Sequence, residues 1–153
     1  MRVRRVLLHS AMWPALAALA AGIYVHATRA AETLPGPVRA RVTQVIDGDT
    51  LAVQARIWLG QDVDIHVRLI GIDAPELKSK CAAERDAAVK AREALALMVG
   101  DSDVILSDVR YDKYGGRVLA RVAAADGTDL ANALVARRLA RPYDGKSRAG
   151  WCG

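Results

Sequence analysis

The chain has 153 residues with a formal net charge of +5 at pH 7. This length allows one domain with a hydrophobic core of its own and leaves no room for an obvious second one. The chain has only two cysteines and three histidines. These numbers argue against a metal site built from four thiolates and against a histidine-rich metal site.

The first thirty residues have the layout of an export signal. Three arginines precede an apolar run from Ala11 to Val25, and small residues follow near Ala27 and Ala30. We expect a signal peptide over residues 1–27, with cleavage as late as residue 30, and a periplasmic or secreted protein. The alternative is an uncleaved membrane anchor, because the apolar segment approaches the roughly 20 residues that a spanning helix needs.

The leader changes what the net charge means. Residues 1–27 carry three arginines and no acid, so their removal lowers the formal charge from +5 to +2. Net charge is therefore weak support for a nucleic-acid partner, and the positions of the basic residues matter more. We expect a linker over residues 28–37 and one monomeric domain over residues 38–153, with a membrane partner only if the leader stays attached.

The first elements of the domain show the alternation of half-buried strands. Apolar and polar residues alternate over 38–43, over 51–57 and, most regularly, over 62–70. Asp47-Gly48-Asp49 predicts a tight turn between the first two strands. On the third strand Arg68 is expected on the face that points away from the core.

The second half of the chain alternates helices and strands. The elements predicted there are a helix over 82–99 that Gly100 ends, strands over 104–109 and 117–125, a helix over 129–140, and an irregular segment over 141–153. This order predicts an α+β fold with a small antiparallel sheet or closed barrel and helices at one side. Parallel βαβ winding is disfavoured because short turns join the first three strands.

The two cysteines, Cys81 and Cys152, both lie in the part expected to be exported. Disulfides persist in oxidising compartments, so we predict that the two residues pair. The alternative is two free, buried thiols.

Histidine chemistry is restricted as well. Once the leader is removed, His66 is the histidine that remains in the domain. Mechanisms that need two histidines are therefore excluded, and we interpret His66 as an exposed strand residue rather than as a catalyst.

Carboxylates remain as the candidates for chemistry. Asp49 ends a turn, and Asp73 and Glu76 follow the third strand, so turns at one end of a barrel can bring the three together. Carboxylates, a backbone carbonyl and water suit Ca²⁺, which takes oxygen ligands in loose geometry. Each turn alone is equally compatible with a simple reversal of the chain. Arg68 favours a site, because an arginine there pairs with the acids or binds an anionic substrate.

A second basic segment precedes the predicted fifth strand. Lys113 and Tyr114 lie in the sequence YDKYGG, and Arg117 follows it. Aromatic rings interleaved with cations suit stacking on bases and contact with phosphates. The alternative is an exposed basic loop without a ligand.

Four segments together resemble the staphylococcal (micrococcal) nuclease family. The segments VIDGDT, VRLIGIDAPE, DKYGGRVLARV and ALVARRLARPY occur in the order of that family and cover nearly all of the chain after the leader. The resemblance implies a five-stranded OB-type barrel flanked by helices. It also implies a Ca²⁺-dependent nuclease that hydrolyses the phosphodiester bonds of DNA, RNA or both.

The resemblance also assigns roles to single residues. Asp49 and Asp73 match the metal carboxylates, and Ala74, which stands where the type member has threonine, matches the backbone-carbonyl ligand. Glu76 matches the general base, and Arg68 and Arg117 match the phosphate-binding arginines. The remaining matches are Asp47 as a supporting acid and Lys113, Tyr114 and Tyr143 around the nucleotide.

An alternative interpretation is a barrel of the same fold that binds a partner without catalysing a reaction. OB-type barrels also bind nucleic acid or protein partners without cutting them. The retention of the metal acids, the base and both arginines favours the enzyme, because a binding module has no need of Glu76.

Overall fold

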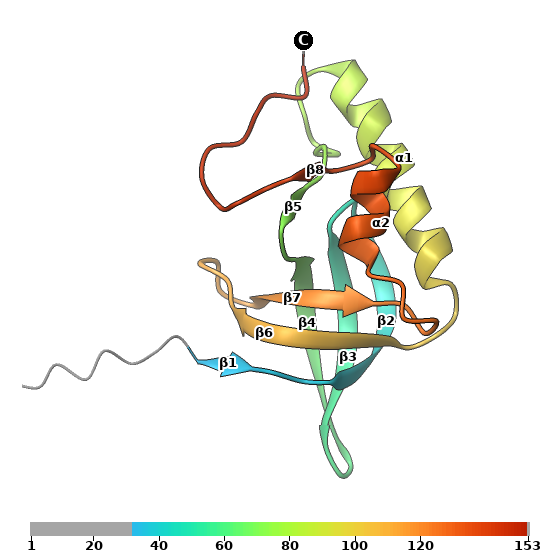
Figure 1. The fold of residues 1–153 in the computed structure, drawn as a ribbon, viewed down its shortest axis with the longest axis vertical. Helices are drawn as coiled ribbons and strands as arrows, with labels where there is room; N and C mark the ends of the chain where they lie inside the picture. Colours follow the sequence, from blue (N-terminus) through green and yellow to red (C-terminus); the bar gives the residue numbers. More distant parts are fainter. Residues whose placement is uncertain (1–31, 153) are drawn as a thin grey trace, which may run out of the picture.

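The computed structural model describes residues 32–152. The expected leader and both cleavage positions lie outside the described residues. Within residues 32–152, no helix combines the length and the apolar character that a membrane span requires. Figure 1 shows a β-barrel with two helices along one side and a C-terminal segment that crosses above it.

Five strands form the barrel, as expected for an OB-type α+β fold. They are β2 (Val38–Asp47), β3 (Thr50–Trp58), β4 (Gln61–Leu69), β6 (Val104–Tyr111) and β7 (Arg117–Ala123). The strand order is β6-β2-β3-β4-β7, and an additional pairing between β6 and β7 closes the ring. β4 and β7 pair in parallel, which the long connection through α1 and β6 allows, whereas the other neighbours are antiparallel.

Three two-residue strands lie outside this ring. β1 (Thr33–Leu34) pairs with β6 and falls within the segment expected to be a linker. β5 (Ile72–Asp73) pairs with β8 (Arg141–Pro142), in a segment expected to be irregular. Strands this short leave no periodic pattern in the sequence, which explains why they were not predicted. The β5–β8 pair brings the end of the chain beside the segment that follows β4.

The helices cover the barrel through small apolar residues. Helix α1 (Ala82–Val99) has the predicted bounds, and its buried residues are Ala88, Ala91, Leu95 and Val99. Helix α2 (Leu130–Ala136) ends earlier than predicted, and its N-cap residue is Asp129, whose side chain accepts a hydrogen bond from the Asn132 N–H at 2.8 Å. The helices, β3, β4, β6 and β7 contribute to one hydrophobic core.

The turn between β2 and β3 packs directly against α1. A Cβ added at Gly48 would lie 2.7 Å from the Ala91 Cβ and 2.9 Å from the Ala74 Cβ. Only glycine therefore fits at this contact, and the helix fixes the height of the turn that carries Asp49.

The disulfide predicted from the sequence is present. Cys81 and Cys152 are bonded, with 6.2 Å between their Cα atoms and 71 residues of separation. A loop of this length corresponds to about 4 kcal/mol of stabilisation in the chain-entropy description. The bond fixes the last described residue to the segment that leads into α1.

Replacing Gly48 with alanine is expected to destabilise the protein by about 1–3 kcal/mol, because the new methyl group overlaps two packed methyl groups. Urea unfolding of the oxidised protein measures the change. Gly115→Ala is the matched control, since a Cβ there would meet no atom within 4 Å. Equal stability of the two variants would contradict the close contact between the turn and α1.

Candidate functional site

An ion pair between Asp49 and Arg68 lies at the centre of the candidate site. Arg68 Nη2 is 2.6 Å from Asp49 Oδ2, and Nη1 donates a hydrogen bond to Oδ1 at 3.0 Å. The Asp49 carboxylate also accepts hydrogen bonds from the Thr50 hydroxyl at 2.9 Å and from the Ala74 N–H at 3.3 Å. Arg68 was expected to point away from the core. It does lie outside the hydrophobic core, but it is only 7% exposed.

Asp73 adds a second buried carboxylate to this pair. Strand β5 carries it to a position where its Oδ1 lies 3.5 Å from Arg68 Nη2. Asp73 Oδ1 and Arg68 Nη2 are both buried, and neither makes a hydrogen bond within residues 32–152, so their contacts there are ion pairs. Asp49, Arg68 and Asp73 come from the β2–β3 turn, β4 and β5, so the fold brings together residues that the sequence separates.

Glu76 lies at the edge of this cluster, in the loop before α1. Its backbone N–H donates a hydrogen bond to Glu84 Oε1 at 3.1 Å, and Glu84 Oε2 accepts one from the Ser79 hydroxyl. These bonds fix the loop to the first turn of α1. The Glu76 side chain itself is half exposed, with a relative accessibility of 51%.

Two residues near the end of the chain complete the cluster. Arg148 Nε lies 3.0 Å from Asp73 Oδ1, and its Nη1 donates a hydrogen bond to Glu76 Oε1 at 2.8 Å. The Trp151 indole N–H donates a hydrogen bond to Asp73 Oδ2 at 3.2 Å. Neither residue belongs to a pattern that marks it as part of a site in the sequence. The predicted Cys81–Cys152 bond was the available signal, because it places the chain end near a residue only five positions after Glu76.

The cluster carries more negative than positive charge. Asp49, Asp73 and Glu76 contact the guanidinium groups of Arg68 and Arg148, and Asp47 adds a fourth acid beside Asp49. The pKa of Asp49 is raised from 3.8 to about 7, chiefly by burial; Arg68 opposes the rise, and the negative charge of Asp47 contributes to it. Asp47 also fixes the turn, since its Oδ1 accepts a hydrogen bond from the Asp49 N–H at 3.1 Å.

These groups fit a divalent cation of the hard, oxygen-binding class. The donors are carboxylate oxygens, which Ca²⁺ prefers, and the cluster has two more acids than guanidinium groups. Asp73 Oδ1 is a buried acceptor whose contacts with Arg68 and Arg148 are ion pairs rather than hydrogen bonds. Among residues 32–152, the one group of three potential ligands whose ligand atoms all lie within 4.8 Å of one another is Cys81, Glu84 and Cys152, and it contains the disulfide and therefore offers no thiolates.

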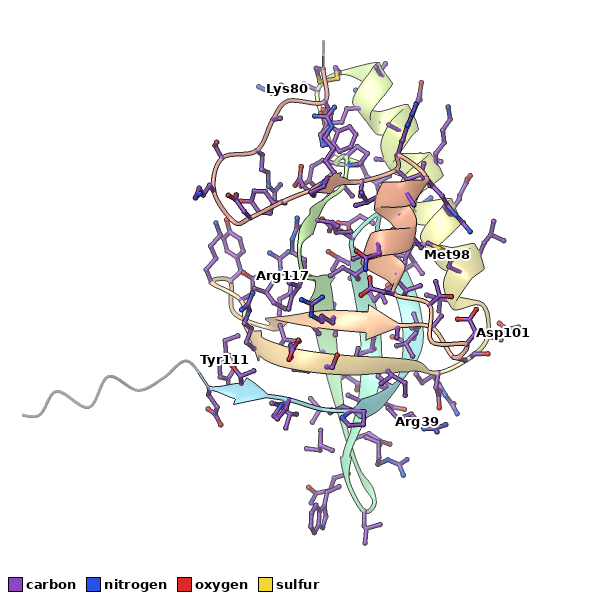
Figure 2. All side chains as sticks on the ribbon, in the orientation of Figure 1. Arg39, Lys80, Met98, Asp101, Tyr111 and Arg117 are labelled. Atoms are coloured by element: carbon purple, nitrogen blue, oxygen red, sulfur yellow. A yellow bond between two sulfur atoms is a disulfide. The ribbon has the colours of Figure 1, made fainter. Side chains whose placement is uncertain are left out.

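A basic pocket of about 390 Å³ lies beside the cluster. It is lined by Arg68, Asp112, Lys113, Tyr114, Arg117, Leu119, Tyr143, Gly145 and Arg148. The predicted phosphate and nucleotide residues are thus brought to one cavity. Figure 2 shows Arg117 on β7, on the side of the barrel below the C-terminal segment.

Contacts within the pocket hold its cations in place. Arg117 Nε lies 2.6 Å from Asp112 Oδ2. The Lys113 ammonium and the Arg117 guanidinium lie 5.1 and 5.2 Å from the centre of the Tyr114 ring. Asp112 was not selected from the sequence, where an acid in a basic loop carries no distinguishing pattern.

The remaining predicted residues lie as follows. Ala74 is 4% exposed, and its N–H donates a hydrogen bond to Asp49. That its carbonyl binds a metal stays a prediction. His66 is exposed on β4 and does not line the basic pocket, in accordance with its interpretation as an ordinary strand residue.

The raised pKa of Asp49 predicts that the free energy of unfolding depends on pH when a chelator keeps the protein free of metal ions. Between pH 4 and 7 the folded protein retains a proton that the unfolded chain releases, so the contribution of this group to the free energy of unfolding falls as pH rises. Asp49→Asn lacks this titration. We expect the stability of wild type relative to Asp49→Asn to fall from pH 4 to pH 7 in urea unfolding experiments. A difference that stays constant across this range would contradict the assignment.

Comparison with known proteins identifies the family. The family model described as "Staphylococcal nuclease homologue" matches residues 66–149, which is more than half of the 153 residues. No curated protein matches the chain. The matched segment includes Arg68, Asp73, Glu76 and Arg117, and the fold adds Asp49 to them through its ion pair with Arg68. The family match and the five-stranded OB-type barrel agree, and the chain belongs to the staphylococcal nuclease family.

Proposed function

We propose that this domain is a calcium-dependent nuclease that hydrolyses phosphodiester bonds in DNA, RNA or both. The observation that carries the proposal is the position of the buried Asp49–Arg68–Asp73 cluster beside a pocket lined by further cations and two tyrosines. Acids that bind a metal and cations that bind phosphate are the two parts that metal-assisted phosphodiester hydrolysis needs.

Glu76 is the proposed general base. Its carboxylate is half exposed, so water reaches it, and its backbone is fixed to Glu84. In this role the ionised carboxylate takes a proton from the water that attacks phosphorus. Its carboxylate accepts a hydrogen bond from Arg148, which lines the basic pocket.

Arg68 and Arg117 are the proposed phosphate ligands. Both line the pocket, and both are held by a carboxylate, Arg68 by Asp49 and Arg117 by Asp112. The contact with Asp112 uses Arg117 Nε, so its Nη groups are the donors that a phosphate would meet. Preorganised donors that stabilise developing negative charge are each worth a few kcal/mol of transition-state stabilisation.

Asp49, Asp73 and the Ala74 carbonyl are the proposed Ca²⁺ ligands, with Asp47 as a supporting acid. The excess of carboxylates and the raised pKa of Asp49 support this assignment. A bound divalent cation supplies Lewis-acid stabilisation of the phosphoryl oxygens. Lys113, Tyr114 and Tyr143 are proposed to contact the nucleotide by charge and by stacking.

We also infer that the domain acts outside the cytoplasm. The disulfide supports this inference, because such bonds persist in oxidising compartments. Cleavage of the leader and a monomeric state remain predictions from the sequence.

The first test is digestion of single-stranded DNA and RNA by the oxidised domain, in Ca²⁺ or in chelator. Wild type is expected to cut only in Ca²⁺, and Glu76→Gln, which keeps the shape of the side chain but cannot act as a base, is expected to cut at least 100-fold more slowly. Wild type that binds nucleic acid without cutting it would support the rival OB-fold binding module instead.

A second test separates charge from geometry at Arg68. Arg68→Lys keeps the positive charge but loses the paired contact with Asp49 and the planar fork that fits a phosphate. We expect a fall in kcat of at least tenfold, while circular dichroism remains that of wild type. Unchanged kcat in this variant would exclude Arg68 as a phosphate ligand.

A further inference from the structure

The end of the chain forms a defined structure over the candidate site. We call residues 143–152 the C-terminal strap. It begins after β8, where the Tyr143 N–H donates a hydrogen bond to the Gly71 carbonyl at 2.8 Å, and it ends at the disulfide to Cys81. Figure 1 shows it crossing above the barrel, and Figure 2 shows the disulfide near Lys80 at the far end of the strap.

The strap is attached through contacts that do not involve Arg148. The disulfide fixes one end, and the Trp151 indole bonds Asp73. The Arg141 guanidinium lies 3.8 Å from the centre of the Trp151 ring and donates a hydrogen bond to the Gly150 carbonyl at 2.9 Å. Arg148 can therefore exchange its partner while the strap stays in place.

Arg148 connects the acids with the basic pocket. Its guanidinium contacts Asp73 and Glu76, and the residue also lines the pocket that contains Arg68 and Arg117. Its side chain has a relative accessibility of 43%, so a ligand in the pocket can reach it. It also lies 5.8 Å from the centre of the Tyr143 ring, which limits its directions of approach.

The charges that line the pocket favour an anion. Four cations, Arg68, Lys113, Arg117 and Arg148, line it together with a single acid, Asp112. Guanidinium groups bind phosphate oxygens in a two-point geometry that an ammonium group cannot reproduce. Arg148 thus belongs to a surface with the charge and the donors that a phosphate backbone needs.

We propose that Arg148 is a third phosphate-contacting arginine of this nuclease, and that the disulfide-bonded C-terminal strap delivers it to the site. The inference rests on the proposed function. Without substrate, Arg148 neutralises Asp73 and Glu76. With substrate, it turns one or both donors to a phosphate oxygen next to the scissile bond, which also leaves the Glu76 carboxylate free to accept a proton.

Binding tests this role apart from catalysis. The probe is a fluorescent single-stranded phosphorothioate oligonucleotide, which keeps the backbone charge and resists hydrolysis, in Ca²⁺ at several salt concentrations. Arg148→Ala is expected to bind about tenfold more weakly at 100 mM salt. Its slope of log Kobs against log salt should be less steep by about 0.7, the value for one lost phosphate contact on a single strand.

Two further variants control this measurement. Arg148→Lys should retain the slope and lose part of the affinity, because it keeps the charge without the fork. Arg39→Ala removes an exposed arginine that lies 3.7 Å from Asp103, away from Arg117 in Figure 2. It should leave both affinity and slope unchanged. A slope that Arg148→Ala does not alter would overturn the proposal, because a merely structural role does not release counterions.

The role of the strap is tested by a mutant cycle. The double variant Cys81→Ser, Cys152→Ser should show the weaker binding of Arg148→Ala, and adding Arg148→Ala to it should cost little more. Fully additive losses would show that Arg148 acts without the strap. Circular dichroism checks that each variant is folded. If the cysteine variants do not fold, Arg148→Ala alone decides whether Arg148 contacts phosphate.

Cutting assays then distinguish the two proposals. If wild type cuts and Arg148→Ala cuts at the same rate or faster, the proposed nuclease activity is supported and the proposed phosphate contact of Arg148 is wrong. Faster cutting would make Arg148 an inhibitory contact. If wild type binds but does not cut, the nuclease is wrong, and the salt slope still decides whether Arg148 contacts phosphate.

Discussion

The buried ion pair between Asp49 and Arg68 is the interaction on which the site depends. It joins the β2–β3 turn to β4, where Thr50 and Arg68 are paired in register, and it positions Asp73 through the same guanidinium. The Asp49 and Arg68 side chains, 4% and 9% exposed, are accommodated in the interior because they are paired and hydrogen-bonded. Loss of either partner would leave the other as an uncompensated buried charge.

The packing around this pair explains why it lies where it does. Gly48 allows the turn to touch α1, and the small side chains of Ala74 and Ala91 provide the space. A larger residue at any of these positions would push Asp49 away from Arg68. The helix therefore affects the Asp49–Arg68 pair by fixing the depth of the turn that carries Asp49.

The same pair leaves the site incompletely neutralised. Arg68 is shared between two carboxylates, and the pKa of Asp49 remains raised to about 7. The protein adds a second guanidinium from the end of the chain, and the disulfide keeps that end in place. An oxidising environment and the arrangement of the site are thus physically connected, because the disulfide, which oxidising conditions favour, positions the residues that contact Asp73 and Glu76.

The barrel strands, the bounds of α1, the disulfide partners and the acids around Arg68 could be predicted from the sequence. Alternation predicts the strands, helical spacing predicts α1, motifs point to the acids, and the disulfide was predictable because the chain has only two cysteines. The burial of Arg68, the pairing of β5 with β8, and the contacts of Arg148 and Trp151 with the acids become visible only in the folded chain. The pair that buries Arg68 joins it to Asp49, 19 residues away, and the other contacts join segments about 70 residues or more apart, so none of them leaves a periodic signal in either segment.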